Sequence, residues 1–225
     1  MRSCRPQMEN MLRLIVFGCS QTYGHCLPDA YVEDKSTWDK IGIAPAPSKL
    51  AFAQHIGDYL GRTVHNLSWP GGSNRNMWYE AVHFEYEPTD IVVCVWTLPD
   101  RSMIVQKQEK HHLGTWPSVN ALNKAYQRFT ALSNSLKDSE LTALHLIDHT
   151  HKVVASQVEN ILHYKLVKAH YEVIPKWASF KFQNSLDYIV PGDKMDFALD
   201  NAHYGVESHK SIARQMIQDL TIGAN

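Results

Sequence analysis

Three apolar runs in the first half of the chain, each followed by glycine, proline or polar residues, predict buried β-strands. They cover residues 11–18, 63–67 and 90–96. The third run is uninterrupted after its first residue, which is typical of a strand at the centre of a parallel sheet with both faces covered. The chain is therefore expected to build its core around parallel strands.

Between these runs, apolar residues recur three or four positions apart, which indicates amphipathic helices. Residues 48–60 predict one helix, with Ser48 as its expected N-terminal cap. Residues 74–84 predict another, with Asn74 as its cap. Strands and helices in strict alternation imply right-handed βαβ units, so the predicted fold class is α/β, with helices on both faces of a parallel sheet.

The second half of the chain is predicted to be mostly helical. One helix is expected to begin at Ser118, and another to cover residues 207–220. Residues 139–164 are ambiguous, because 141–147 are consistent with a strand while apolar residues keep a helical phase through the whole segment; we favour one long helix. Residues 170–174 then predict a fourth strand.

The length of 225 residues suits a single domain of generous size. We expect residues 11–221 to form that domain, after a short N-terminal tail over residues 1–10. Two stretches interrupt the strand–helix pattern, near residues 27–47 and 97–117, and are interpreted as loop insertions.

The composition is ordinary for a soluble globular protein, with 44% hydrophobic and 20% charged residues. The net charge is -1 and no block of like charges occurs, which argues against nucleic acid or anionic lipid as a partner. No apolar run approaches the ~20 residues that cross a bilayer, and no signal-peptide pattern is present. We expect a cytoplasmic protein without membrane contact, and virion association stays open. The four cysteines are interpreted as reduced thiols, although a Cys19–Cys26 bridge is conceivable.

Candidate chemistry gathers where the predicted strands end. Ser20 follows the first strand, residues 71–74 follow the second and residues 97–100 follow the third. Because ligands bind beyond the carboxyl ends of parallel strands, these segments are expected to share one rim of the sheet. A serine hydroxyl becomes a good nucleophile only when a base accepts its proton. His203 is the candidate base, and Asp200 can hold its other ring nitrogen. Taken singly, the two motifs are more often structural, the first as a tight turn and the second as a capping pair.

Three segments together resemble a known family. Residues 18–24, GCSQTYG, are similar to the first sequence block of the SGNH, or GDSL, hydrolases. Residues 66–74, NLSWPGGSN, are similar to the second block, and residues 200–203, DNAH, to the last. The order and spacing match from residue 11 to about residue 216. The variant pattern is especially similar to SGNH-like proteins encoded by tailed bacteriophages.

The resemblance implies a flavodoxin-like, three-layer α/β/α fold with a parallel sheet of four to five strands. It implies Ser20 as nucleophile, His203 as base and Asp200 as the partner that orients the base. It also implies that the backbone N–H groups of Ser20 and Gly71 donate to the oxyanion. It calls for no cofactor and no metal.

One position departs from the family pattern. The third block of the family places an asparagine after the third strand as a further oxyanion donor, and this position falls on or near Pro99. Proline offers neither an N–H nor a side-chain donor. Asn74 is a possible substitute on the same rim, unless its amide only caps the helix, and Thr97 is a weaker one.

Histidines and tryptophans raise alternatives that the sequence does not favour. His145 and His149 lie four residues apart, but no third ligand for a metal is evident. His209 is interpreted as structural, and the pair at residues 111–112 as part of an exposed loop. Three tryptophans flank the rim loops, and ordinary packing is favoured over stacking on a sugar or an acyl chain for Trp69, Trp96 and Trp116.

The leading hypothesis is a serine esterase that acts through an acyl-enzyme on Ser20. An O-acetyl or other short acyl group on a carbohydrate, or another small ester, is the expected substrate. Transfer of the acyl group to an alcohol other than water is a variant of this hypothesis. The alternative is a binding or structural protein that keeps the SGNH fold with impaired chemistry, possibly of phage origin. The sequence makes no prediction of oligomeric state.

Overall fold

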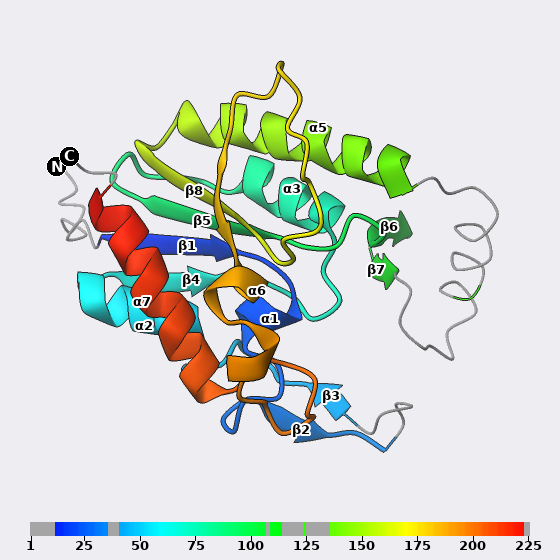
Figure 1. The fold of residues 1–225 in the computed structure, drawn as a ribbon, viewed down its shortest axis with the longest axis vertical. Coiled ribbons are helices and arrows are strands. Elements are labelled where there is room, and N and C mark those ends of the chain that lie inside the picture. The colour runs from blue at the N-terminus through cyan, green and yellow to red at the C-terminus, as the bar shows by residue number, and fades with distance from the viewer. Residues whose placement is uncertain (1–11, 36–40, 107–108, 114–123, 125–135, 223–225) are drawn as a thin grey trace, which may run out of the picture.

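The computed structural model describes residues 12–35, 41–106, 109–113, 124 and 136–222. Its centre is a five-stranded sheet with strand order β4-β1-β5-β8-β9, in which all neighbours are parallel (Figure 1). The five strands are β1 (Arg13–Phe17), β4 (Thr63–Asn66), β5 (Ile91–Trp96), β8 (Asn160–Lys165) and β9 (Phe182–Ser185). The predicted strands over residues 11–18, 63–67 and 90–96 are therefore confirmed as β1, β4 and β5.

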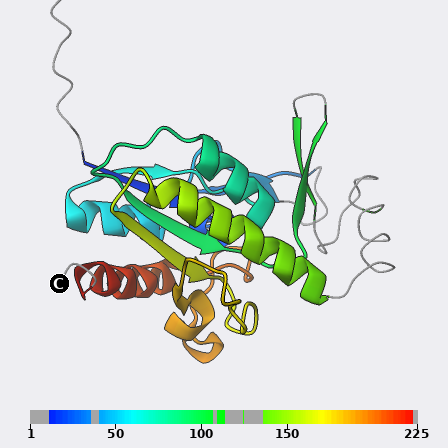
Figure 2. The same cartoon turned by 90° about the horizontal axis from the view of Figure 1, so that it is seen from above.

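Helices cover both faces of this sheet, as Figure 2 shows from above. Two helices, α2 (Phe52–Leu60) and α7 (Val206–Ile222), pack on one face, and two others, α3 (Asn74–His83) and α5 (Leu136–Ala155), pack on the opposite face. The predicted three-layer α/β/α fold is confirmed. The helices expected over 48–60, 74–84 and 207–220 are confirmed as α2, α3 and α7, although α2 starts later than expected.

The core consists of two apolar clusters, one on each side of the sheet. Successive residues of β1 alternate between them: Leu14 and Val16 join the cluster under α2 and α7, and Ile15 and Phe17 join the cluster under α3 and α5. All six residues of β5 are buried, as expected for the central strand of the sheet. The uninterrupted apolar run in the sequence therefore reflects burial on both faces.

The long helix favoured over residues 139–164 is wrong. Helix α5 ends at Ala155, and residues 160–165 form strand β8. The helical phase is real within α5, but the side chains of Ser156 and Gln157 both donate to the carbonyl of Val153, at 2.7 and 3.2 Å. Polar side chains that bond to the local backbone compete with helix continuation, and here they accompany the turn that leads into β8.

The fourth strand expected over residues 170–174 is also wrong. That segment is irregular, and Tyr171 has a φ of 58°, in the left-handed region, which is incompatible with a strand. The fourth strand along the chain in the sheet is β8, and the fifth is β9. The helix expected from Ser118 lies outside the described residues.

Both predicted helix caps are corrected by the hydrogen bonds. Helix α2 begins at Phe52, and Ser48 instead donates to Asp29 and accepts from the N–H of Leu50. The cap of α3 is Ser73, whose side chain accepts from the N–H of Asn76, so Asn74 is the first helical residue.

The two predicted insertions hold small antiparallel pairs of strands. Strands β2 (Tyr31–Glu33) and β3 (Ile41–Ile43) pair within residues 27–47, and β6 (Ser102–Gln106) and β7 (Glu109–Leu113) pair within residues 97–117. Among the described residues, no helix is both long and apolar enough to span a membrane.

Candidate active site

Ser20 lies at the point where β1 turns into the short helix α1 (Ser20–Tyr23). The turn is tight: a Cβ on Gly18 would lie 2.1 Å from Oγ1 of Thr22, so only glycine fits there. Gly24 ends the helix with a φ of 73°. As the first residue of a helix, Ser20 presents a backbone N–H that has no acceptor within the helix. Ser20 is 7% exposed, so it is largely buried at this edge of the sheet.

The glycine-rich loop after β4 packs against the turn that carries Ser20. The N–H of Trp69 donates to the carbonyl of Gly18 at 3.3 Å. A Cβ on Gly72 would lie 3.2 Å from the same carbonyl, so glycine allows the two loops to approach. Gly71, with a φ of 75°, belongs to this loop, and its role as an oxyanion donor stays a prediction.

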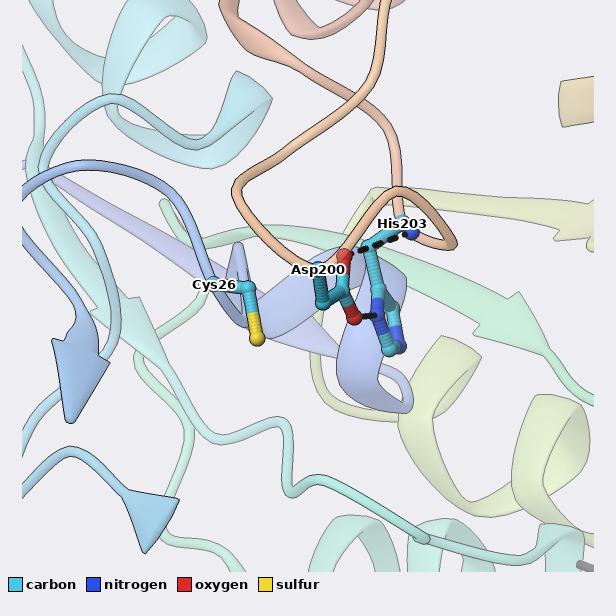
Figure 3. Close-up of side chains that lie close together, drawn as sticks. All are labelled: Cys26, Asp200 and His203. Carbon is cyan, nitrogen blue, oxygen red and sulfur yellow. Dashed lines mark hydrogen bonds and ion pairs between the residues drawn. The ribbon is translucent and has the colours of Figure 1, made fainter. Parts of the chain in front are cut away.

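Asp200 and His203 form a hydrogen-bonded pair in the loop before α7 (Figure 3). The Nδ1 of His203 lies 2.5 Å from Oδ2 of Asp200. The other carboxylate oxygen, Oδ1, accepts from the N–H groups of Ala202 and His203, each at 3.1 Å. An acceptor on Nδ1 places the imidazole proton there, which leaves Nε2 free to accept a proton.

The surroundings of Asp200 keep it ionised. Burial alone raises the pKa of this carboxyl, but the hydrogen bond and charge of His203 and the two N–H donors lower it by more. The pKa therefore lies well below its ordinary value, and Asp200 is a carboxylate at neutral pH. This carboxylate therefore holds the imidazole of His203 in one orientation through Nδ1.

Hydrogen bonds join the loop that carries Asp200 and His203 to helix α1 and to the segment that follows α1. The N–H of Tyr204 donates to Oε1 of Gln21 at 3.0 Å, and the N–H of Leu199 donates to the carbonyl of Cys26 at 3.1 Å. The rings of His25 and His203 meet edge to face, with centroids 5.2 Å apart. These contacts hold His203 over the segment that begins with Ser20, although the two residues are far apart in sequence.

Ser20 and His203 do not form a hydrogen bond in this state. Both residues belong to the described part of the chain, and no bond within 3.5 Å joins Oγ to Nε2 there. In free enzymes, catalytic hydrogen bonds are often long and shorten only when substrate binds. The structure therefore shows the contact between His203 and Asp200, whereas a catalytic role for these two residues and for Ser20 stays a prediction.

Asn74 occupies the rim, but its amide is fully engaged. Its Oδ1 accepts from the N–H of Thr97 at 2.9 Å, and its Nδ2 donates to the carbonyl of Thr97 and to the hydroxyl of Tyr171, at 3.2 and 2.6 Å. The Tyr171 hydroxyl donates in turn to the carbonyl of Thr97 at 2.8 Å. This buried cluster joins the start of α3, the end of β5 and the segment after β8. Both amide hydrogens of Asn74 have acceptors, so neither is available to an oxyanion without rearrangement.

Thr97 is less constrained than Asn74. Its Oγ1 accepts from Nη1 of Arg101 at 3.1 Å, which leaves its own O–H to donate elsewhere. Pro99, at the position of the family's third-block asparagine, is buried beyond the end of β5. Among the described residues predicted for a third donor, Thr97 therefore keeps a hydroxyl group that can still donate.

Three of the remaining histidines of the prediction have aromatic or structural partners, and the pair at residues 111–112, predicted to lie in a loop, belongs instead to strand β7. His145 stacks on Trp177, with centroids 4.3 Å apart, and Nδ1 of His149 accepts from Nε1 of Trp78 at 2.8 Å. His209 accepts the N–H of Phe52 through Nδ1 at 3.1 Å, in agreement with the structural interpretation.

The predicted aromatic residues differ in exposure. Trp96 is buried and its indole N–H donates to Nδ1 of His163 at 3.0 Å. Trp69 is 43% exposed and packs edge to face with Tyr23. Trp116 lies outside the described residues. Of the two that belong to the described residues, Trp69 is thus the one that presents an exposed surface to a ligand.

Two residues of the site were not singled out by sequence. The sequence predicts a strand for the segment of Tyr171, and this prediction gives no sign that its hydroxyl contacts Asn74 and Thr97. Cys26 lies close to the His203–Asp200 pair, with one ligand atom of each of the three residues within 4.8 Å of the others (Figure 3). No motif in the sequence signals this proximity, because Cys26 and Asp200 belong to loops at opposite ends of the chain.

The sequence matches no protein-family model and no curated protein. Solved structures do match. An acetyl xylan esterase (Est2A) from the rumen bacterium Butyrivibrio proteoclasticus superposes with a TM-score of 0.57 at 12% identity, over 95% of this chain and 64% of that chain. A carbohydrate esterase described as having divergent catalytic and non-catalytic binding functions superposes with a TM-score of 0.53 at 10% identity, over 93% and 68%.

A protein of the G-D-S-L family from Desulfitobacterium hafniense DCB-2 is similar more loosely, with a TM-score of 0.46 at 8% identity over 92% of this chain and 98% of that chain. The chain spans 64% of the acetyl xylan esterase, so about a third of that protein has no counterpart here. At such low identity the likeness concerns the fold. The five-stranded parallel sheet, its two helical layers and the likeness to the two esterases with TM-scores above 0.5 show that the chain has the three-layer α/β/α fold of these esterases, which is the fold that the resemblance to the SGNH hydrolases implied.

Proposed function

We propose that the protein is a serine esterase in which Ser20 is the nucleophile, His203 the general base and Asp200 the residue that orients it. The observation that carries the proposal is the 2.5 Å contact between His203 Nδ1 and Asp200 Oδ2, in a loop fastened to α1 through Tyr204 and Gln21. Activation of a hydroxyl requires a base with a nitrogen that can accept its proton, and Nε2 of the oriented imidazole meets this need in a loop that is hydrogen-bonded to the helix beginning at Ser20.

The reaction proceeds in two halves. Oγ of Ser20 attacks the ester carbonyl while Nε2 of His203 takes its proton, and the resulting tetrahedral oxyanion collapses as His203 returns the proton to the leaving alcohol. A water molecule then attacks the acyl-Ser20 ester with His203 again acting as base, and the acid is released with Ser20 regenerated. An alcohol in place of water gives acyl transfer by the same steps.

The oxyanion is expected to lie between the N–H groups of Ser20 and Gly71. A third donor is missing at Pro99, and the amide of Asn74 is committed to Thr97 and Tyr171. Loss of one oxyanion donor typically costs about 10²–10³ in rate. We therefore expect a slower esterase than a site with three donors, unless Thr97 turns its hydroxyl toward the substrate.

The proposed substrate is an O-acetyl or other short acyl ester on a carbohydrate. Two structural neighbours are esterases that act on, or are named for, carbohydrates, which supports this class at the level of fold. Trp69, exposed beside the glycine-rich loop, offers an aromatic face on which a sugar ring can stack.

Hydrolysis of p-nitrophenyl acetate tests the proposal. The wild-type protein should release p-nitrophenol, and Ser20→Ala should reduce the rate to that of the buffer without unfolding the protein. Ser211→Ala, on helix α7, serves as the matched control and should keep the wild-type rate. Equal rates for wild type and Ser20→Ala would show that Ser20 is not the nucleophile.

A second candidate function is favoured by the engaged amide of Asn74 and by Pro99. The chain would then be a binding protein that uses the same rim for a carbohydrate without cleaving it. In that case neither wild type nor Ser20→Ala releases p-nitrophenol, while both bind acetylated xylo-oligosaccharides with equal affinity in a calorimetric titration. Under the esterase proposal, only Ser20→Ala leaves such an oligosaccharide intact.

A further inference from the structure

We propose that Cys26, Asp200 and His203 form a binding site for a thiophilic divalent cation such as Zn²⁺, which switches off the base of the proposed esterase when it is occupied. The metal site itself does not depend on the esterase proposal, but the inhibitory effect rests on it.

The three side chains converge from two loops. Ligand atoms of Cys26, Asp200 and His203 all lie within 4.8 Å of one another, and Figure 3 shows the three side chains side by side next to α1. The loops are joined by the hydrogen bond from the N–H of Leu199 to the carbonyl of Cys26. The thiol is therefore held beside the pair by the backbone, and its position does not depend on a flexible side chain alone.

The backbone at this thiol has an unusual conformation. Cys26 has a φ of 64°, in the left-handed region, and its side chain is buried. An L-residue in this region costs about 1–2 kcal/mol relative to its ordinary conformation, and glycine is the residue that avoids the cost. Cys26 nevertheless lies there, with its sulfur within 4.8 Å of a ligand atom of Asp200 and of His203. Such strained positions gather at functional sites, which supports a role for the thiol beyond packing.

These three ligand types favour zinc and other transition metals that bind thiolate. Thiolate, imidazole and carboxylate are the three ligand types of protein zinc sites, and three protein ligands leave a fourth position for water. Calcium and magnesium take oxygen ligands, so a buried thiol disfavours them. At zinc–ligand distances of about 2.0–2.3 Å, tetrahedral ligands lie ~3.5 Å apart. If Nδ1 of His203 is the ligand, its contact with Oδ2 of Asp200 must therefore open by about 1 Å, and Sγ of Cys26, which lies within 4.8 Å of both residues, must take up the same spacing.

Metal binding removes the base whichever ring nitrogen is used. If the cation takes Nδ1 of His203, the imidazole proton moves to Nε2, which can then no longer accept the proton of Ser20. If the cation takes Nε2, it occupies the accepting position directly. Cys26 binds as thiolate and its proton passes to the solvent, so binding releases one proton and becomes tighter as the pH rises.

Cobalt binding tests the site without any need for catalysis. Co²⁺ added to the metal-free full-length protein should produce the near-ultraviolet charge-transfer absorption of a thiolate–cobalt bond. Cys26→Ser should abolish this absorption and weaken binding by at least about tenfold, as expected when a ligand is lost. Cys94→Ala, which removes a thiol from the core strand β5, should keep it, and so should Ser20→Ala. Cys26→Gly, which suits the left-handed backbone, repeats the test if Cys26→Ser is poorly folded by circular dichroism.

Inhibition then links the site to the proposed activity. Zn²⁺ should inhibit the hydrolysis of p-nitrophenyl acetate by the wild-type protein, and a chelator should restore it. Relative to its own rate without metal, Cys26→Ser should need at least about tenfold more Zn²⁺ for the same inhibition. An absorption that is absent in wild type, or unchanged in Cys26→Ser, overturns the metal site whether or not the protein is an esterase. Equal sensitivity of both proteins to Zn²⁺ overturns the inhibitory role.

Discussion

At the scale of single residues, Asp200 places a negative charge beside the imidazole of His203 in the proposed site. One oxygen binds the imidazole of His203 and the other accepts two backbone N–H groups, so both oxygens of the carboxylate have donors. These donors and the charge of His203 outweigh burial and keep the pKa of Asp200 low. The carboxylate thus fixes both the tautomer of His203 and the shape of its loop.

Asp200→Asn is predicted to lower kcat by about 10³–10⁴ with a smaller effect on KM, because an amide can turn its NH₂ toward Nδ1 and favour the wrong tautomer. Steady-state kinetics with p-nitrophenyl acetate measure the effect. Asp193→Asn, at an exposed position in the same region, is the control and should leave kcat unchanged. A kcat within threefold of wild type for Asp200→Asn would remove Asp200 from the mechanism.

Asn74 acts as a positioning residue according to its hydrogen bonds. Asn74→Ala leaves the N–H of Thr97 and the hydroxyl of Tyr171 with fewer partners in a buried setting, and unsatisfied buried groups cost about 1–3 kcal/mol each. We predict a loss of about 2–4 kcal/mol in the free energy of unfolding, measured by urea denaturation. Asn160→Ala, at an exposed position, is the control. A stable Asn74→Ala variant with strongly reduced kcat would instead favour the oxyanion role that the sequence suggested.

At the scale of elements, the N-terminus of α2 is hydrogen-bonded to a side chain of α7. The N-cap of α2 is Ala51, which has no side-chain acceptor, and the N–H of Phe52 donates to His209 in α7. The rings of Phe52 and His209 also stack, with centroids 5.7 Å apart. One face of the sheet is therefore covered by two helices that share a polar contact as well as an apolar one.

His209→Phe tests this dependence, because it keeps an aromatic ring against Phe52 and removes only the acceptor. We predict that the free energy of unfolding falls by about 1–3 kcal/mol, the cost of one unsatisfied buried N–H. Urea denaturation gives the value. An unchanged free energy of unfolding would mean that stacking, and not the hydrogen bond, is what His209 contributes.

The elements that the sequence predicted correctly are those with a strong local signal. The apolar runs of β1, β4 and β5 and the periodic patterns of α2, α3 and α7 are read directly from neighbouring residues. The boundary between α5 and β8 depends on a turn that breaks no periodicity, and β9, FQNS, has little apolar character to announce it. Its place in the sheet is set by pairing with β8, a long-range contact.

In the candidate site, too, some residues have a local signal in the sequence and others are brought in by long-range contacts. Ser20, Gly71, Asp200 and His203 lie in short motifs whose order along the chain predicts that they meet at one rim. The engagement of Asn74 by Tyr171 and the approach of Cys26 to His203 arise from packing between loops. No spacing in the sequence encodes these contacts, so only the folded chain reveals them.

At the scale of the whole molecule, two buried histidines couple stability to pH. Burial lowers the pKa of His163 and of His209 to about 3 each, against about 6.5 in the unfolded chain. Between these values the unfolded state binds more protons, so the free energy of unfolding rises with pH and falls as pH drops below 6.5. The stabilising neutral state is complete above that pH.

From pH 7 to pH 5.5, we predict that the two histidines together lower the free energy of unfolding by about 2–3 kcal/mol. Urea denaturation at the two pH values measures the change. His209→Phe removes one of the two groups and should reduce the loss by about half. An unfolding free energy that is equal at pH 7 and 5.5 would contradict the burial of both rings as neutral groups.

The central claim is that Ser20 is activated by the oriented His203, and labelling with a fluorophosphonate tests it most directly. Such probes react with an activated serine and leave a stable phosphonyl adduct that peptide mass spectrometry locates. We predict one adduct on Ser20 in the wild-type protein, slower labelling in His203→Ala and none at this site in Ser20→Ala. No adduct in folded wild-type protein, or equal labelling of wild type and His203→Ala, would contradict the claim.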